Sequence, residues 1–207
     1  MNETKIQFSK FETELMCNTD IILTKNRILE KVRLLFEELQ KHMAGFEPHR
    51  PNQNEIFKIP AKISKGENYK GLPYLILDYP RFFKSENIFA VRTMFWWGNF
   101  FSSTLHISGL QKFIHGPALK ANSALLAQKH FYIGVNSNPW IHHFEETNYR
   151  KIEIGKDIPE EDFTLPHLKI ATKMPLEEWP SALETLLKNW RLLISVSEGL
   201  VATNPVE

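Results

Sequence analysis

Three polar residues interrupt apolar segments where they could bind or react with a small molecule: Asp78, Arg92 and His106. The planar guanidinium of an arginine binds carboxylates and phosphates through two parallel hydrogen bonds. A histidine titrates near neutral pH and can act as a general acid or base. If adjacent strands carry these residues, their side chains can meet in one site. The neighbouring Tyr79 and Arg81 complete this set of candidate ligand-binding residues.

The same residues also have a purely structural explanation. Asp78 begins the turn-like segment Asp-Tyr-Pro-Arg, and its carboxylate would then bond Arg81 or backbone amides. Arg92 would pair with some other carboxylate, because buried charged groups are normally paired. The residue types alone favour this explanation over a ligand site.

Adjacent histidines at His142 and His143 are the candidate metal ligands. Neighbouring residues of a strand point to opposite faces, so the two imidazoles would not chelate one ion together. Other histidines, His115, His130 or His167, would have to complete a site. Cys-x-x-Cys and His-Glu-x-x-His spacings are missing, as are the glycine-rich signatures of nucleotide cofactors. We therefore expect no metal site and no cofactor.

Aromatic residues crowd the segment 95–101, where Trp96 and Trp97 are further candidates for ligand binding. Five bulky aromatic residues around a turn would favour association if they stayed exposed. Helices of the same chain are the simplest cover; a second subunit and an apolar ligand are the alternatives.

Basic and aromatic residues also alternate across 62–84, a pattern that suits single-stranded nucleic acid, whose bases stack on rings while phosphates meet lysine and arginine. Acidic residues interrupt this segment, and no RNA-binding motif occurs in it. Packing in the core or at its rim explains most of these aromatic residues equally well.

The elements that must position these residues centre on a hairpin at 87–108. Gly98-Asn99 suits the two central positions of a type II′ turn, which would place Trp97 opposite Phe100. In that register Arg92 and His106 lie on opposite faces of the sheet and cannot share a site. A slip of one residue would exchange the two faces.

Helical periodicity appears near 25–44, 117–129 and 180–198, and more weakly at 8–17. Asparagine or threonine at 24–26 would cap the first long helix, and Pro117 suits the first turn of the next. Strand-like runs occur at 55–64, 73–79, 87–97, 100–108, 130–135, 139–146, 149–154 and 167–173. We predict an α+β fold with a mainly antiparallel sheet of about six strands. No linker divides the chain, so we expect a single domain over 1–207.

Composition restricts the functional classes. The 207 residues carry a formal charge of +1 and one cysteine, Cys17, without a secretory signal or a membrane-spanning run. We expect a soluble cytoplasmic protein with no membrane partner and no general attraction for nucleic acid. The leading hypothesis is a binding or interaction domain that uses an aromatic-rich sheet surface or pocket, with a second copy or a small apolar or anionic ligand as partner. The alternatives are an enzyme with a dispersed site that includes Arg92 and nearby histidines, and a single-stranded nucleic-acid binder.

Overall fold

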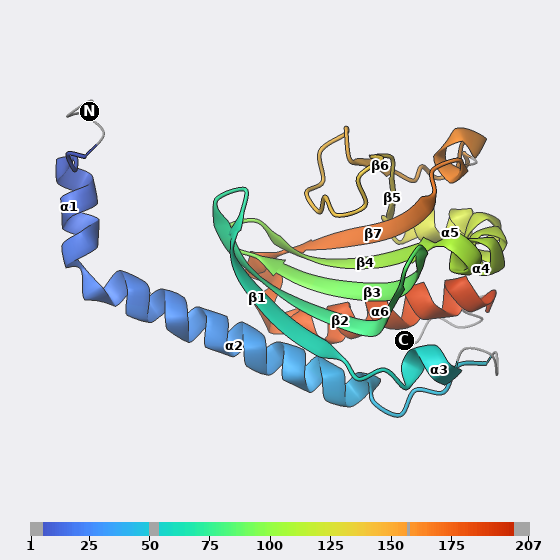
Figure 1. Ribbon diagram of the computed structural model, residues 1–207, viewed down its shortest axis with the longest axis horizontal. Helices are drawn as coiled ribbons and strands as arrows, with labels where there is room; N and C mark the ends of the chain where they lie inside the picture. The colour runs from blue at the N-terminus through green and yellow to red at the C-terminus, as the bar shows by residue number, and fades with distance from the viewer. Residues whose placement is uncertain (1–5, 50–53, 157, 201–207) are drawn as a thin grey trace.

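The computed structural model describes residues 6–49, 54–156 and 158–200, and within these ranges the chain forms an α+β fold around a seven-stranded antiparallel sheet (Figure 1). The predicted fold class is confirmed, with seven strands in place of about six. The strand order is β1-β2-β3-β4-β7-β5-β6. The strands are β1 (Lys62–Tyr69), β2 (Leu72–Lys84), β3 (Asn87–Trp96), β4 (Phe100–Ser108), β5 (Tyr132–Gly134), β6 (Tyr149–Lys151) and β7 (His167–Pro175).

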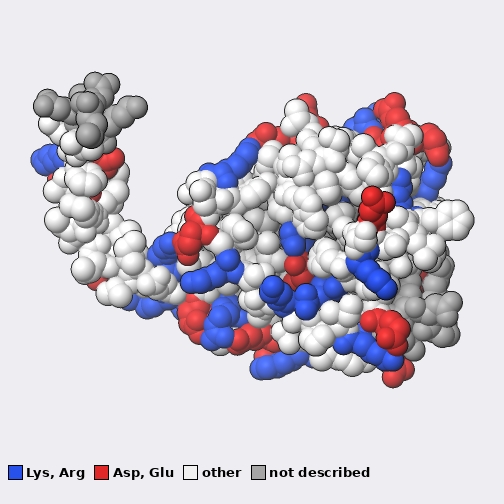
Figure 2. All heavy atoms as spheres, in the orientation of Figure 1, with Lys and Arg blue, Asp and Glu red and all other residues white. Residues whose placement is uncertain are grey.

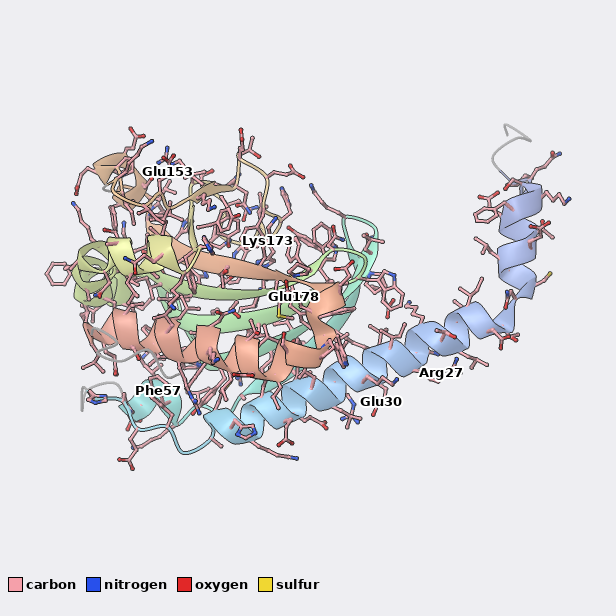
Figure 3. All side chains as sticks on the ribbon, turned by 180° about the vertical axis from the view of Figure 1, so that it is seen from behind. Arg27, Glu30, Phe57, Glu153, Lys173 and Glu178 are labelled. Atoms are coloured by element: carbon pink, nitrogen blue, oxygen red, sulfur yellow. The ribbon has the colours of Figure 1, made fainter. Side chains whose placement is uncertain are left out.

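Helices cover one face of the sheet, and α6 lies across that face when the molecule is seen from behind (Figure 3). The core between the layers is rich in aromatic rings, among them Phe36, Phe101 and Trp190. The helices are α1 (Lys10–Cys17), α2 (Thr19–Met43), α3 (Asn54–Phe57), α4 (Gly109–Ala121), α5 (Ser123–Gln128) and α6 (Ala182–Glu198), with 3₁₀ helices at Glu160–Phe163 and Leu176–Ser181.

Two helix predictions need correction at their starts. The first long helix begins at Thr19, because the side chain of Asn18 accepts a hydrogen bond from the amide of Asp20 and caps the helix there. The helix predicted at 117–129 is two helices, α4 and α5, and Pro117 lies inside α4 instead of in a first turn. The weaker prediction at 8–17 is confirmed by α1, where Ser9 and Glu12 form a capping box.

Two strand predictions are wrong. Residues 55–61 contain the short helix α3, and β1 begins only at Lys62, so the sheet starts later than the alternating pattern indicated. Residues 139–146 form an irregular loop, whose backbone bonds mainly to side chains and not to a neighbouring strand.

The hairpin of β3 and β4 exists, but its register differs by one residue from the prediction. Trp96 lies opposite Phe100, and residues 97–99 form the turn. The amide of Asn99 donates to the carbonyl of Trp96 at 3.0 Å, which makes Gly98 the third residue of this turn, at a φ of 69°. A glycine tolerates positive φ at either central position of a turn, so its presence alone does not fix the register. Arg92 consequently pairs with Thr104 and lies on the same face as His106.

The aromatic segment 95–101 is covered chiefly by the rest of the chain. Phe101 contacts Phe36 of α2 and Trp179, with ring centroids 6.4 and 6.0 Å apart. On the other face, Trp96 packs against Tyr69 at 5.1 Å. Other parts of the same chain therefore cover this segment, which was the simplest of the three alternatives. The ring of Trp97 stays partly exposed.

Among the described residues, no helix combines the length and apolarity that crossing a bilayer would require.

Trp190 joins α6 to the sheet, and its truncation tests the core. Its ring stacks on Tyr79 at 6.0 Å, and its indole nitrogen donates to the carbonyl of Tyr79 at 2.6 Å. We expect Trp190→Ala to lower the free energy of unfolding by about 3–5 kcal/mol in chemical denaturation. Phe113→Ala, at an 81% exposed position, should stay within about 0.5 kcal/mol of the parent. Equal effects of the two substitutions would contradict this description of the core.

Candidate functional site

The face of the sheet opposite the long helices carries an unusual concentration of buried polar side chains, which we call the polar face. In one row across the strands, Asp78 pairs with Arg92, and Arg92 with Thr104. In the next row His106 pairs with Lys169 of β7. His167 lies two residues from Lys169 on the same strand and so faces the same side. The members of this set are Asp78, Arg92, Thr104, His106, His167 and Lys169.

Asp78 and Arg92 form a bidentate ion pair, with distances of 2.8 Å from Nε to Oδ1 and 2.9 Å from Nη2 to Oδ2. Asp78 therefore lies in strand β2 and starts no turn. Arg81 follows a bulge in β2 and donates instead to the carbonyl of Pro60 at 2.7 Å. Tyr79 points to the opposite, helix-covered face, where it is buried. Of the predicted ligand-binding residues, the structure thus brings Asp78, Arg92 and His106 onto one face.

Lys169 is the most unusual member of the polar face and was not among the predicted site residues. Only 2% of the residue is exposed, and its Nζ donates to the carbonyl of Ile141 at 2.5 Å and lies 4.7 Å from the centroid of the Tyr149 ring. Burial, reinforced by the nearby positive charge of Arg92, lowers the pKa of Lys169 to about 7. The amine therefore loses its proton near neutral pH. The segment His-Leu-Lys-Ile-Ala contained the signal, since its alternation places His167 and Lys169 on one side of a strand.

The imidazoles of the polar face are held in the neutral form. Burial, with the charge of Lys169 as the second cause, lowers the pKa of His106 to about 3, and burial also lowers the pKa of His167. Their rings lie 5.7 Å apart. The Nε2 atoms of both are buried and make no hydrogen bond to the described part of the chain. Buried polar atoms are normally hydrogen-bonded, so these two nitrogens mark a place where a water molecule or a ligand could bind.

A loop between β5 and β6, residues 135–148, lies over the polar face, and we call it the cover loop (Figure 1). Arg92 donates through Nη1 to Nε2 of His142 at 3.1 Å, so this nitrogen is an acceptor. Burial, followed by the charge of Arg92, holds the pKa of His142 well below its usual range. Tyr69 Oη accepts the amide hydrogens of His142 and His143 at 2.7 and 3.2 Å. The two histidines thus anchor the cover loop to Arg92 and Tyr69. They do not lie on a strand, so that prediction is wrong.

Gly134, just before the cover loop, leaves room for the lysine. A Cβ atom placed on Gly134 would come within 2.9 Å of Lys169 Cβ, closer than real side chains approach one another. The absence of a side chain at 134 is therefore what allows β5 to pair with β7 beside Lys169.

The cover loop closes the polar face almost completely. The cavity lined by Arg92, His106, His142 and Lys169 has a volume of about 10 Å³, room for about one water molecule. A larger cleft of about 780 Å³ lies near the β5–β6 edge of the sheet, and Tyr149 lines it. Because Tyr149 also contacts Lys169, its ring is a wall shared by the open cleft and the buried site.

The remaining predicted residues do not join this site. His115 is buried in α4 against Phe89, and His130 lies in the turn before β5. Trp96 and Trp97 point to opposite faces of the hairpin, Trp96 toward Tyr69 and Trp97 toward Phe95. In the segment 62–84, Tyr79 lies in the core, and Lys70 is paired with Glu145. Binding of nucleic acid by this segment stays a prediction.

Within the described ranges, no three histidine, cysteine, aspartate or glutamate side chains gather closely enough to hold a metal ion. No protein-family model, curated protein or solved structure matches this chain.

Replacement of Lys169 by methionine tests whether the burial of Lys169 lowers the free energy of unfolding. Unfolded Lys169 has a pKa near 10.5 and folded Lys169 one of about 7, so between these values the unfolded chain binds more protons and stability rises with pH. The difference corresponds to on the order of 5 kcal/mol below pH 7. We expect Lys169→Met to raise the free energy of unfolding most at pH 6, and to lose this advantage progressively toward pH 10.5, as measured by chemical denaturation.

The matched control is Lys173→Met, an exposed position on the same face of β7 (Figure 3). It should change stability little and without this pH dependence. If Lys169→Met destabilised the chain at pH 6, Lys169 would be a satisfied structural cation, which contradicts the argument above.

Proposed function

We propose that this chain binds a small anionic ligand, one that carries a carboxylate or a phosphate group, on the polar face beneath the cover loop. The observation that carries the proposal is Lys169, a buried lysine that forms no ion pair with a carboxylate of the described residues. Lysines are almost never fully buried unless they are paired. A ligand that brings negative charge would supply the missing partner.

The charge balance of the site supports an anion. Arg92 and protonated Lys169 contribute two positive charges, whereas Asp78 is the single carboxylate that contacts either of them in the described structure. One of the two positive charges is therefore unbalanced. In a buried site of low polarity, this charge attracts an anion far more strongly than an exposed lysine would.

The neutral imidazoles add directional hydrogen bonds. A neutral imidazole carries one N–H donor and one acceptor nitrogen, and the Nε2 atoms of His106 and His167 are free of protein partners among the described residues. If these atoms carry the protons, they donate to oxygen atoms of the ligand. The closed cavity means that the cover loop must shift to admit a ligand, and the cleft beside Tyr149 is the adjoining open surface.

Calorimetric titration with inorganic phosphate and with acetate, at pH 8, tests the proposal. An anion bound beside Lys169 favours its charged form, so binding should take up close to one proton for each ligand bound. The proton uptake is measured by repeating the titration in buffers of different ionisation enthalpy. In Lys169→Met we expect binding at least about 10-fold weaker, without proton uptake.

Lys173→Met again serves as the control and should bind as the parent does. Equal loss of binding in both variants would indicate a general charge effect on the surface. No saturable binding of either anion to the parent chain, or binding without proton uptake, would reject the proposed site.

A second candidate function is catalysis, and the depressed pKa of Lys169 favours it. A buried lysine that is neutral near pH 7 is a nucleophile toward carbonyl carbon. Its amine would add to an aldehyde or ketone, and loss of water would then give an imine. In such a site, Arg92 would hold a carboxylate of the substrate, and the two hydrogen atoms of the amine would leave with the carbonyl oxygen as water.

Trapping with borohydride distinguishes this candidate. The chain is incubated with glyoxylate and reduced, and the peptides are analysed by mass spectrometry. We expect the reduced adduct mainly on Lys169, with Lys173 on the same strand as an internal control. Uniform labelling of the lysines, or none on Lys169, would exclude imine chemistry while leaving anion binding untouched.

A further inference from the structure

The N-terminal part of the chain forms a helical arm that leaves the body of the molecule (Figure 1). We define the arm as residues 6–27, that is, α1 and the first turns of α2. In α1 no residue is buried, and the buried residues of α2 begin only at Val32. The large apolar side chains of the arm are instead 41–75% exposed: Ile6, Phe8, Phe11, Leu15, Met16, Ile21, Ile22 and Leu23.

The arm is a regular helical structure with defined ends. Ser9 and Glu12 form the capping box of α1, and Asn18 caps α2 directly after it. The sequence contains no glycine or proline before Gly45. A short isolated helix is marginally stable in water, and helices in proteins depend mainly on packing of an apolar face. The arm therefore requires a surface that covers its apolar side chains.

An apolar groove lies where α2 leaves the body. It has a volume of about 440 Å³ and lies between α2, the tip of the β3–β4 hairpin and the 3₁₀ helix at Leu176–Ser181. Its single charged lining residue is Lys31, and its apolar walls include Ile28, Val32, Phe95, Trp97, Phe101 and Trp179. The aromatic tip of the hairpin, which the chain covers incompletely at Trp97, thus forms one wall of the groove.

The arm cannot cover the groove of its own chain. Ile28 and Val32 of the groove belong to α2, and the first turns of α2, which are part of the arm, run straight away from them (Figure 3, where Glu30 and Arg27 mark the point of departure). Beyond them, α1 turns aside at Asn18. To fold back, α2 would have to break at a position without glycine or proline. A second molecule can cover the groove without any break in α2.

We propose that a second copy of this chain is the partner. Two α2 helices would lie antiparallel across a two-fold axis, so that the arm of each copy covers the groove of the other. Such an arrangement is self-complementary, as two-fold interfaces are. It places Ile21 and Ile22 of one arm near Ile28 of the partner molecule, and in that register Asp20 approaches Lys31 across the interface.

The area available matches a stable dimer. The eight arm side chains together expose on the order of 600 Å² of apolar surface. With the groove added, each copy contributes about the 800 Å² typical of a specific interface. A membrane surface fits less well, because residues 10–27 carry three basic and three acidic side chains and so have no excess of positive charge. Figure 2 shows that much of the arm on this face carries no charged side chain.

Sedimentation equilibrium of the full chain at about 1–100 µM tests the proposal. We expect the parent to show roughly twice the 24.2 kDa of one chain, and Ile22→Glu to be monomeric. Phe113→Glu, at an 81% exposed position on α4, is the control and should remain dimeric. Circular dichroism serves to check that each variant is folded. Because Ile22 is 57% exposed, its replacement should not unfold the body of the molecule.

A charge reversal tests the register. Asp20→Lys should weaken the dimer at least about 5-fold, and the double variant Asp20→Lys with Lys31→Asp should recover most of that loss. A parent chain that is monomeric at 100 µM, or a dimer that Ile22→Glu leaves unchanged, would overturn the proposal. So would a monomer that binds to phosphatidylcholine–phosphatidylserine vesicles through the arm, since the arm would then be a membrane anchor.

Discussion

The pairing of Trp96 with Phe100 across the turn at 97–99 determines which side of the sheet every residue of β3 and β4 faces. Side chains alternate along a strand, so this single contact sends Phe95 and Phe101 to the helices and Arg92 to the polar face. No intermediate arrangement exists, because a slip by one residue would exchange both sets. The same register therefore places the aromatic side chains in the core and the polar side chains in the candidate site.

The two faces make opposite contributions to stability. The helix-covered face buries aromatic and aliphatic side chains, which stabilise the fold in proportion to the area removed from water. The polar face buries Lys169 and His106, whose charged forms are disfavoured there, so it weakens the fold at low pH. Proteins commonly tolerate such local cost at binding and catalytic sites. The apolar core on the helix-covered face supplies the stability that offsets the cost of burying Lys169 and His106 on the polar face.

Long periodic elements were predictable from the sequence, whereas contacts between distant segments were not. The apolar stripes at 25–44 and 180–198 indicated α2 and α6, and the glycine at 98 located a turn. The glycine could not fix the register, because it tolerates positive φ at either central position. The histidine pair at 142–143 resembled a strand locally, but its backbone bonds to Tyr69, 73 and 74 residues away. The alternation at 167–169 indicates that His167 and Lys169 share a face, but the burial of Lys169 depends on that same loop, through its bond to Ile141, and the local pattern does not show this.

Gly134 of β5 and Lys169 of β7 lie side by side on neighbouring strands. The atom that leaves no room for a side chain at 134 is the Cβ of Lys169, and every residue type except glycine carries a Cβ atom. A smaller residue in place of the lysine would therefore not relieve the clash. In homologous chains that keep this strand pairing, position 134 should stay glycine whatever residue stands at 169.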